Sequence, residues 1–225
     1  MRALKIGLVT IGQSPRTDVT PIIKEVLGTE VELVEKGALD GLTREEIGMF
    51  APAAGDYMLV TRMRDGTCVK VARRYVFPRV QKCIEELEEM GVNLTLLLCT
   101  AEFPEIEAKR LLINPDKLVT NIVLGILNRG KLAVVVPDKK QISVARRKWR
   151  KKGISLVMVT ANPYGEIEAS KEAANFLAKQ NADLIILDCI GFAPKHKELF
   201  RHLTGKPVIL PQTAIGWILK ELVSA

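Results

Sequence analysis

Two cysteines, Cys99 and Cys189, stand at the same place in two similar segments of the 225-residue chain, 90 positions apart. Segments 91–99 and 181–189 align without a gap, and each predicts a turn, a short buried strand and then the cysteine. Strands of this kind are buried on both faces of a parallel sheet, and ligands bind at the edge where they end. Two thiols at that edge could serve as base and acid on opposite faces of one carbon.

The remaining cysteines and the histidines give no sign of a metal site or a disulfide. Cys68 and Cys83 fall inside a predicted strand and a predicted helix, where a thiol usually packs as a small apolar group. The four cysteines form no CxxC pair, and His196 and His202 lack the spacing of a zinc site. We therefore expect reduced thiols, no metal and no cofactor.

Loops that follow the predicted strands supply candidates for binding a substrate. Residues 12–16 lead from the first strand into a helix, where backbone N–H groups, Ser14 and Arg16 could hold a carboxylate or phosphate. This loop lacks the glycine spacing of a nucleotide site. The matching loop, residues 160–165, is equally consistent with an ordinary Asn-Pro turn. The candidate substrate-binding residues are Thr10, Gly12, Gln13, Ser14, Arg16, Arg62, Thr100, Asn162, Tyr164, Gly191 and Thr213.

Strand and helix patterns alternate along the chain and recur in its second half, which predicts an α/β fold. Predicted strands 4–10, 31–35 and 94–98 correspond to 131–137, 154–159 and 184–187, and a last strand covers 207–210. Helices are predicted over 21–27, 42–47, 75–90, 117–127, 169–180 and 214–223, and Asp65-Gly66 predicts a hairpin over 57–72. We expect two pseudo-symmetric lobes with parallel sheets and a ligand cleft between their carboxyl edges. Residues 1–113 with the C-terminal helix 214–225 would form the first lobe, and 114–213 the second.

The composition predicts a globular protein. Hydrophobic residues make up 48% of the chain, which is enough for a substantial core. No apolar run approaches the roughly 18 residues of a membrane span. The N-terminal apolar run is broken by Gly7, Thr10 and Gly12, so it does not predict a signal peptide. We expect a cytoplasmic protein with no membrane partner.

The net charge of +7 comes from one segment. Residues 139–152 contain eight Lys and Arg and no acid, whereas the rest of the chain has 25 basic and 26 acidic residues. A helix there would place Ile142, Ala145 and Trp149 on one side and its charges in solvent. We interpret it as a solvated helix face, with binding of a polyanion or acidic partner as the alternative. No accompanying motif indicates nucleic-acid binding, and we do not expect it.

Six motifs spread over the length of the chain resemble the AroM family. They are Thr10-Ile-Gly-Gln-Ser-Pro-Arg16, Gly37-Ala-Leu-Asp-Gly41, Val60-Thr-Arg-Met-Arg-Asp-Gly66, Leu97-Leu-Cys-Thr100, Ala182-Asp-Leu-Ile-Ile-Leu-Asp-Cys189 and Thr204-Gly-Lys-Pro-Val-Ile-Leu210. The arrangement is also similar to the wider aspartate/glutamate/hydantoin racemase superfamily. That superfamily includes maleate isomerase and arylmalonate decarboxylase, and each of its two flavodoxin-like lobes offers a cysteine.

The second resemblance implies that Cys99 and Cys189 are the catalytic pair of a cofactor-independent racemase, isomerase or decarboxylase acting at the alpha carbon of a small carboxylic acid. Racemases usually follow each cysteine with small polar residues; Thr100 keeps one, whereas Ile190 and Gly191 do not. A strict amino-acid racemase is therefore in doubt, and an isomerase or decarboxylase with unequal thiols stays open. The alternative is a protein that binds or senses a small metabolite on the same fold. The oligomeric state stays open, with a homodimer among the alternatives.

Overall fold

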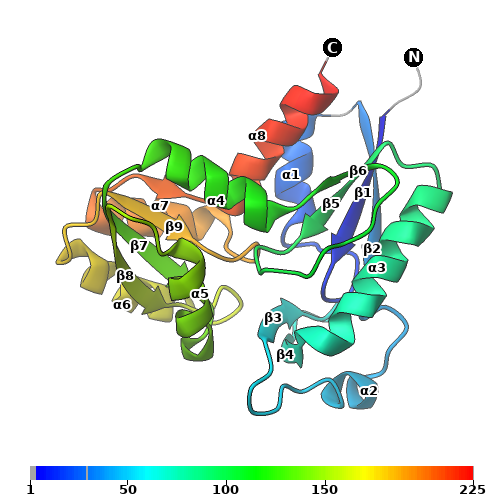
Figure 1. Cartoon of the computed structure of the whole chain (residues 1–225), viewed down its shortest axis with the longest axis horizontal. Coiled ribbons are helices and arrows are strands. Elements are labelled where there is room, and N and C mark those ends of the chain that lie inside the picture. Colours follow the sequence, from blue (N-terminus) through cyan, green and yellow to red (C-terminus); the bar gives the residue numbers. More distant parts are fainter. Residues whose placement is uncertain (1–3, 29, 225) are drawn as a thin grey trace. The chain divides into compact units, whose positions relative to one another are not determined.

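The computed structural model describes residues 4–28 and 30–224, which divide into two compact units. Unit 1 contains the described chain up to Asp116 and again from Ile215, whereas unit 2 contains Lys117–Ala214. The C-terminal segment therefore returns to the unit in which the chain begins (Figure 1). Among the described residues, no helix is both long and apolar enough to cross a membrane.

Unit 1 is built on a parallel four-stranded sheet of order β2-β1-β5-β6. Its strands are β1 (Leu4–Thr10), β2 (Val31–Gly37), β5 (Leu94–Leu98) and β6 (Leu111–Ile113). The register pairs Thr10 with both Gly37 and Leu98, so three strands end level at one edge. Every residue of β5 is buried, as expected for a central strand covered on both faces. Cys99 follows directly at this edge.

Helices cover both faces of the unit 1 sheet (Figure 1). The remaining elements of this unit are α1 (Thr20–Leu27), α2 (Arg44–Gly48), the hairpin of β3 (Met58–Arg62) and β4 (Cys68–Ala72), and α3 (Arg73–Glu89). Helix α3 packs on β1 and β2 and places Val76, Val80 and Leu87 in the core. The hairpin interrupts the βα alternation where Asp65-Gly66 predicts it, which confirms that prediction.

Unit 2 repeats the strand order of unit 1. Its parallel sheet has the order β10-β9-β7-β8, so β7, β8, β9 and β10 take the places of β1, β2, β5 and β6. The strands are β7 (Gly130–Val136), β8 (Ile154–Thr160), β9 (Leu184–Leu187) and β10 (Val208–Ile209). This shared order confirms the duplicated α/β fold that the two cysteine-ending segments predict.

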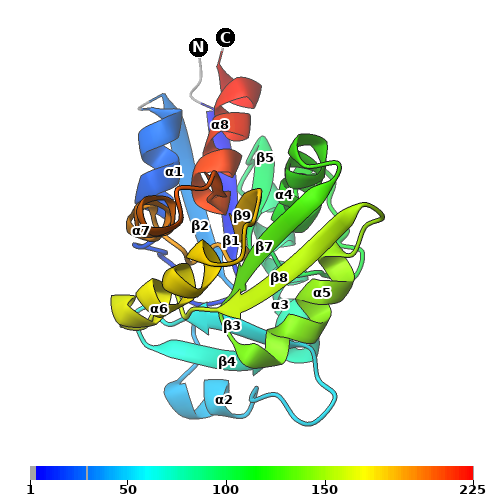
Figure 2. The same cartoon turned by 90° about the vertical axis from the view of Figure 1, so that its left-hand side faces the viewer.

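Helix α5 packs on β7 and β8, while α6 and α7 lie side by side against the opposite face of the unit 2 sheet (Figure 2). The helices with residues in this unit are α4 (Pro115–Ile126), α5 (Ile142–Trp149) after a 3-10 turn at Lys139–Gln141, α6 (Ile167–Ala178), α7 (Pro194–Thr204) and α8 (Pro211–Val223). Phe192 and Phe200 pack into the same core as the strand residues. Helix α8 continues into unit 1, where Gly216 lies against Val26 of α1.

The structure contains two elements that the sequence patterns do not predict. Strand β6 has three residues, too few to show a period. Helix α7 buries only His196 and Phe200, so its apolar stripe is weak in the sequence. Helix α8 begins at Pro211, earlier than predicted, and Thr213 therefore lies in its first turn.

Candidate functional site

Cys99 and Cys189 occupy the same local turn in their two units. In each turn the cysteine N–H donates to the carbonyl oxygen two residues earlier, at 2.9 Å for Cys99 and 2.8 Å for Cys189. In each turn the cysteine Sγ accepts the N–H two residues later, from Ala101 at 3.5 Å and from Gly191 at 3.4 Å. The two residues are 6% and 8% exposed. Each turn therefore directs a backbone N–H at its cysteine sulfur, and the same local geometry occurs in both units.

The other two cysteines have different surroundings. Cys83 lies on α3, where burial and the charges of Glu86 and Asp40 raise the pKa of its thiol to about 11. A thiol that stays protonated is poorly suited to catalysis. None of the four cysteines, all of which the structure describes, is in a disulfide. The described part of the chain contains no cluster of His, Cys, Asp and Glu that could hold a metal ion.

The buried arginine that follows β1 is paired within unit 1. Arg16 donates from Nε and Nη2 to the two carboxylate oxygens of Asp18, each at 2.8 Å, and from Nη1 to Thr10 Oγ1 at 3.0 Å. Burial alone would raise the pKa of Asp18, but the hydrogen bond and charge of Arg16 outweigh burial and lower that pKa. Arg62 lies 3.6 Å from the same carboxylate, and its side chain is 29% exposed against 2% for Arg16. Arg62 is therefore the better placed of the two to meet an incoming carboxylate.

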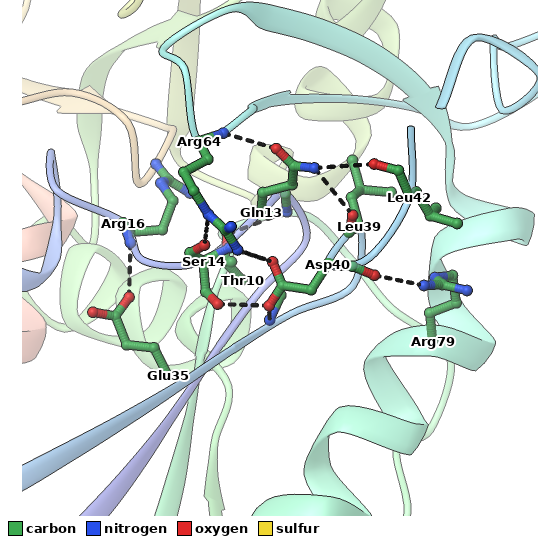
Figure 3. Close-up of polar contacts among 12 residues, drawn as sticks. Thr10, Gln13, Ser14, Arg16, Glu35, Leu39, Asp40, Leu42, Arg64 and Arg79 are labelled. Atoms are coloured by element: carbon green, nitrogen blue, oxygen red, sulfur yellow. Dashed lines mark hydrogen bonds and ion pairs between the residues drawn. The ribbon is translucent and has the colours of Figure 1, made fainter. Parts of the chain in front are cut away.

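Asp40 ties the loop after β1 to the turn after β2 (Figure 3). Its carboxylate accepts the Ser14 N–H at 2.8 Å, the Ser14 hydroxyl at 2.5 Å and the Gly37 N–H at 2.7 Å. The Arg64 side chain donates from Nε to the Ser14 carbonyl oxygen at 2.7 Å, and the backbone N–H of Arg64 donates to Gln13 Oε1 at 2.9 Å. Gln13 and Ser14 thus form hydrogen bonds that shape the loop. Asp40 is not among the residues predicted from the sequence, although it lies in one of the AroM-like motifs.

Gly12 has no room for a side chain. A Cβ at this position would lie 2.3 Å from the carbonyl oxygen of Arg62 and 2.5 Å from Thr61 Oγ1. The Gln13 N–H donates to the same carbonyl oxygen at 3.2 Å. Strand β3 therefore packs directly against the loop after β1, and this contact positions Arg62.

In unit 2, Tyr164 packs against the turn that holds Cys189. A Cβ on Gly191 would lie 2.3 Å from the Tyr164 hydroxyl oxygen and 2.5 Å from the ring carbon that bears it. Asn162 orients this loop, because its Oδ1 accepts the Tyr164 N–H at 3.0 Å. The hydroxyl of Tyr164 therefore lies against the residue whose N–H contacts the Cys189 sulfur.

The first turn of α8 secures the loop that follows Cys189. Gln212 Nε2 donates to the Ile190 carbonyl oxygen at 2.8 Å, and Thr213 Oγ1 donates to the carbonyl oxygen of Leu210, the residue after β10, at 3.1 Å. In unit 1, Thr100 follows its cysteine and is buried. Thr213 and Thr100 therefore each lie at the sheet edge of their own unit.

The residue before Cys189 is a buried carboxylate. Asp188 Oδ1 lies 3.0 Å from Lys148 Nζ, and Oδ2 accepts the indole N–H of Trp149 at 2.7 Å. Both partners come from α5, which forms part of the basic segment 139–152. Lys148 is also absent from the predicted site residues, because nothing in the sequence distinguishes it from the neighbouring basic residues.

A protein family described as AroM protein matches residues 6–223. The chain belongs to the AroM family. No curated protein matches its sequence. In this AroM-family chain, the family-like motifs supply the loop after β1, the Asp40 turn, the β3–β4 hairpin and both cysteine turns.

Several solved structures share the fold. The maleate isomerase Iso from Pseudomonas putida S16 has a TM-score of 0.63 and 13% identity, covering 97% of this chain and 92% of that chain. The glutamate racemase of Francisella tularensis has a TM-score of 0.64 and 15% identity, covering 99% of this chain and 81% of that chain. The Picrophilus torridus aspartate racemase has a TM-score of 0.60 and 14% identity, covering 98% of this chain and 94% of that chain. At these identities the similarity shows the fold, which is that of the Asp/Glu racemase-like proteins.

Proposed function

We propose that this protein is a cofactor-independent enzyme that transfers a proton at the alpha carbon of a small carboxylic acid, as an isomerase, racemase or decarboxylase. The observation that carries the proposal is the repeated turn, in which Cys99 and Cys189 follow the equivalent strands β5 and β9 and each accept a backbone N–H on sulfur. Structural neighbours named maleate isomerase, aspartate racemase and arylmalonate decarboxylase support this class of reaction. The chemistry requires reduced thiols, which a cytoplasmic location would maintain.

In the proposed reaction, one cysteine acts as a thiolate and takes the alpha proton. The electron pair of the broken C–H bond moves into the carboxylate and gives an enediolate. The other cysteine is a thiol and delivers its proton to the opposite face of the same carbon. In a decarboxylation the bond to the leaving carboxylate breaks instead, CO₂ departs, its bonding electrons stay on the carbon, and a thiol protonates that carbon.

The enediolate carries negative charge that hydrogen-bond donors must stabilise. We assign the carboxylate to Arg62, because its guanidinium is partly exposed and a guanidinium can bind a carboxylate through two hydrogen bonds. The residues assigned to substrate contact are Thr10, Arg62, Thr100, Asn162, Tyr164, Gly191 and Thr213. The residues assigned to shaping the binding loop are Gly12, Gln13, Ser14 and Arg16.

Solvent exchange at the alpha carbon tests the proposal over a range of candidate substrates. The protein is incubated in deuterated water with a panel of 2-amino, 2-hydroxy, unsaturated and malonic acids, and NMR follows the alpha position. Wild type should convert at least one member of the panel. Cys99→Ser and Cys189→Ser should each slow that conversion by about 100-fold or more, since each removes a general acid or base.

Cys68→Ser and Cys83→Ser are the matched controls, because neither cysteine follows a strand of a parallel sheet: Cys68 begins β4 of the hairpin, and Cys83 lies inside α3. Both controls should retain most of the wild-type rate. Conversion that survives in Cys99→Ser or Cys189→Ser would contradict the two-thiol mechanism, even if the enzyme class were correct.

The second candidate function is a protein that binds or senses a small metabolite. It is favoured by the apolar Ile190, which is buried next to Cys189 and offers no polar side chain to a reacting group. A carboxylic acid that raises the melting temperature but is never converted or exchanged would support this alternative. Conversion of that acid would exclude it.

A further inference from the structure

The two cysteine-ending segments differ at the residue before the cysteine. Cys99 follows Leu98, whereas Cys189 follows Asp188, so unit 2 carries a carboxylate where unit 1 carries an apolar side chain. Both positions are buried. The Asp188 carboxylate contacts α5, whereas Cys189 packs with core residues of α6 and α7, so the carboxylate does not contact the thiol and acts on it only through its charge. A negative charge held one residue away in the sequence disfavours a second negative charge on the thiol.

Lys148 compensates this carboxylate from α5. Its Nζ lies 3.0 Å from Asp188 Oδ1, and the two side chains are 7% and 5% exposed. Trp149 donates its indole N–H to the other carboxylate oxygen at 2.7 Å. The Asp188 N–H donates to the Val135 carbonyl oxygen at 2.8 Å, which anchors the pair to the sheet.

This ion pair is poorly explained by stability alone. Desolvation of two buried charges largely offsets their attraction, so such a pair adds little net stability. Loss of one partner has a larger effect, because the other charge then stays buried and uncompensated. Along α5, Arg146 and Arg147 are exposed, whereas the Lys148 side chain points inward to the residue that precedes Cys189.

Two other titratable groups near the Cys189 turn, His196 and Tyr164, do not supply a positive charge. Burial lowers the pKa of His196 to about 4, so its ring is neutral at pH 7. The Tyr164 hydroxyl lies against Gly191 and is a hydrogen-bond donor rather than a cation. Lys148 therefore supplies the positive charge that contacts the carboxylate next to this thiol.

We infer that Lys148 is a positioning residue for Cys189: by compensating Asp188, its ammonium group lets the adjacent thiol ionise at neutral pH. Cys99 follows Leu98 and needs no such compensation. The inference deepens the proposed function, and its meaning for catalysis rests on that proposal. Its test measures thiol ionisation directly.

Alkylation of each cysteine in the full chain by iodoacetamide, read by peptide mapping from about pH 6 to about pH 10, tests the inference. Lys148→Met should slow alkylation of Cys189 about tenfold at neutral pH, because the uncompensated carboxylate raises the thiol pKa. The rates of the variant and wild type should converge at high pH, where the thiol is ionised in both. Cys99 in the same molecule is the reference and should keep its rate.

Two further variants separate charge from packing. Asp188→Asn leaves the ammonium group without its carboxylate and should speed alkylation of Cys189 at neutral pH. The double variant Lys148→Met/Asp188→Asn has neither charge, and its Cys189 rate should return to within about threefold of wild type. Arg146→Met removes an exposed charge from the same helix and should change neither thiol.

An unchanged Cys189 rate in Lys148→Met would overturn the inference, as would a slow rate that the double variant does not restore. If Lys148→Met misfolds, buried Cys83 becomes reactive as well, and Asp188→Asn and the double variant decide the question. A wild-type protein that converts no carboxylic acid would count against the proposed function alone, since these alkylation profiles need no substrate.

Discussion

Glycine and alanine differ by one methyl group, and this difference separates the two cysteine turns. Ala101 donates its N–H to the Cys99 sulfur, whereas Gly191 donates to the Cys189 sulfur. The phenol of Tyr164 occupies the space that a methyl group at Gly191 would need. The local backbone is therefore duplicated, while the side chains around it are not.

Substitution of Gly191 by alanine should displace the Tyr164 ring and destabilise the protein by about 1–3 kcal/mol, because a methyl group cannot share the space of the hydroxyl oxygen. The double variant Gly191→Ala/Tyr164→Ala should recover part of this loss, since the smaller side chain leaves room. Urea denaturation measures both effects. Equal destabilisation of Gly191→Ala and the double variant would show that the phenol is not the cause.

Tyr164→Phe tests the hydroxyl alone. The ring and its packing remain, so stability should change by less than about 1 kcal/mol. The rate of the proposed proton transfer should fall about tenfold or more if the hydroxyl donates to the substrate. The measurement is the deuterium exchange assay, and an unchanged rate would remove Tyr164 from the substrate-contacting residues.

At the scale of elements, the start of α7 contains a buried histidine. His196 is 1% exposed, and its Nδ1 accepts the Ala193 N–H at 3.0 Å. Burial lowers its pKa from 6.5 to about 4. Because the folded pKa lies below the unfolded value, the unfolded chain binds the proton first as the pH falls. This contribution to stability is complete above about pH 6.5 and declines as the pH falls toward about 4.

His196→Gln should abolish this part of the pH dependence. Glutamine at the third position of a helix can still accept the N–H at the helix start, so the capping contact is kept. Between about pH 7.5 and pH 5, wild type should lose about 2 kcal/mol of unfolding free energy that His196→Gln retains. Urea denaturation at the two pH values is the measurement.

His202→Gln is the matched control, because His202 is exposed on the same helix. It should show the wild-type fall in stability. The assignment to His196 fails if the two variants respond to pH alike.

At the scale of the whole molecule, the chain leaves unit 1 after Asp116 and returns to it from Ile215. The returning part of α8 is not a loose tail. Ile215 and Leu219 are fully buried, and a Cβ on Gly216 would lie 3.2 Å from Val26. Unit 1 therefore depends on residues from both ends of the sequence.

Leu219→Ala should lower the unfolding free energy by about 2–5 kcal/mol, the usual cost of a cavity left by a buried leucine. Leu222→Ala, on the same helix but 49% exposed, should cost less than about 1 kcal/mol. Urea denaturation of the two variants compares them directly. Similar losses would mean that α8 is not anchored through its buried face.

The sequence by itself determined the α/β class, the duplication and the place of both cysteines at strand ends. These features are local, because a buried strand needs a continuous apolar run and Asp65-Gly66 needs a tight turn. The sequence did not predict strand β6 or helix α7. A three-residue strand is too short to show an alternating pattern, and a helix that buries only His196 and Phe200 has a weak apolar stripe.

Only the tertiary structure decided which polar side chains meet. Lys148 reaches Asp188 across 40 positions of sequence, and Ser14 reaches Asp40 across 26. The basic residues of 139–152 cannot be told apart by their sequence pattern. Only the fold shows that Lys148, among them, contacts the Asp188 carboxylate. Likewise, the need for Gly191 becomes visible only when Tyr164 lies against it. Such contacts depend on distance in space, which the pattern of residues along a chain does not encode locally.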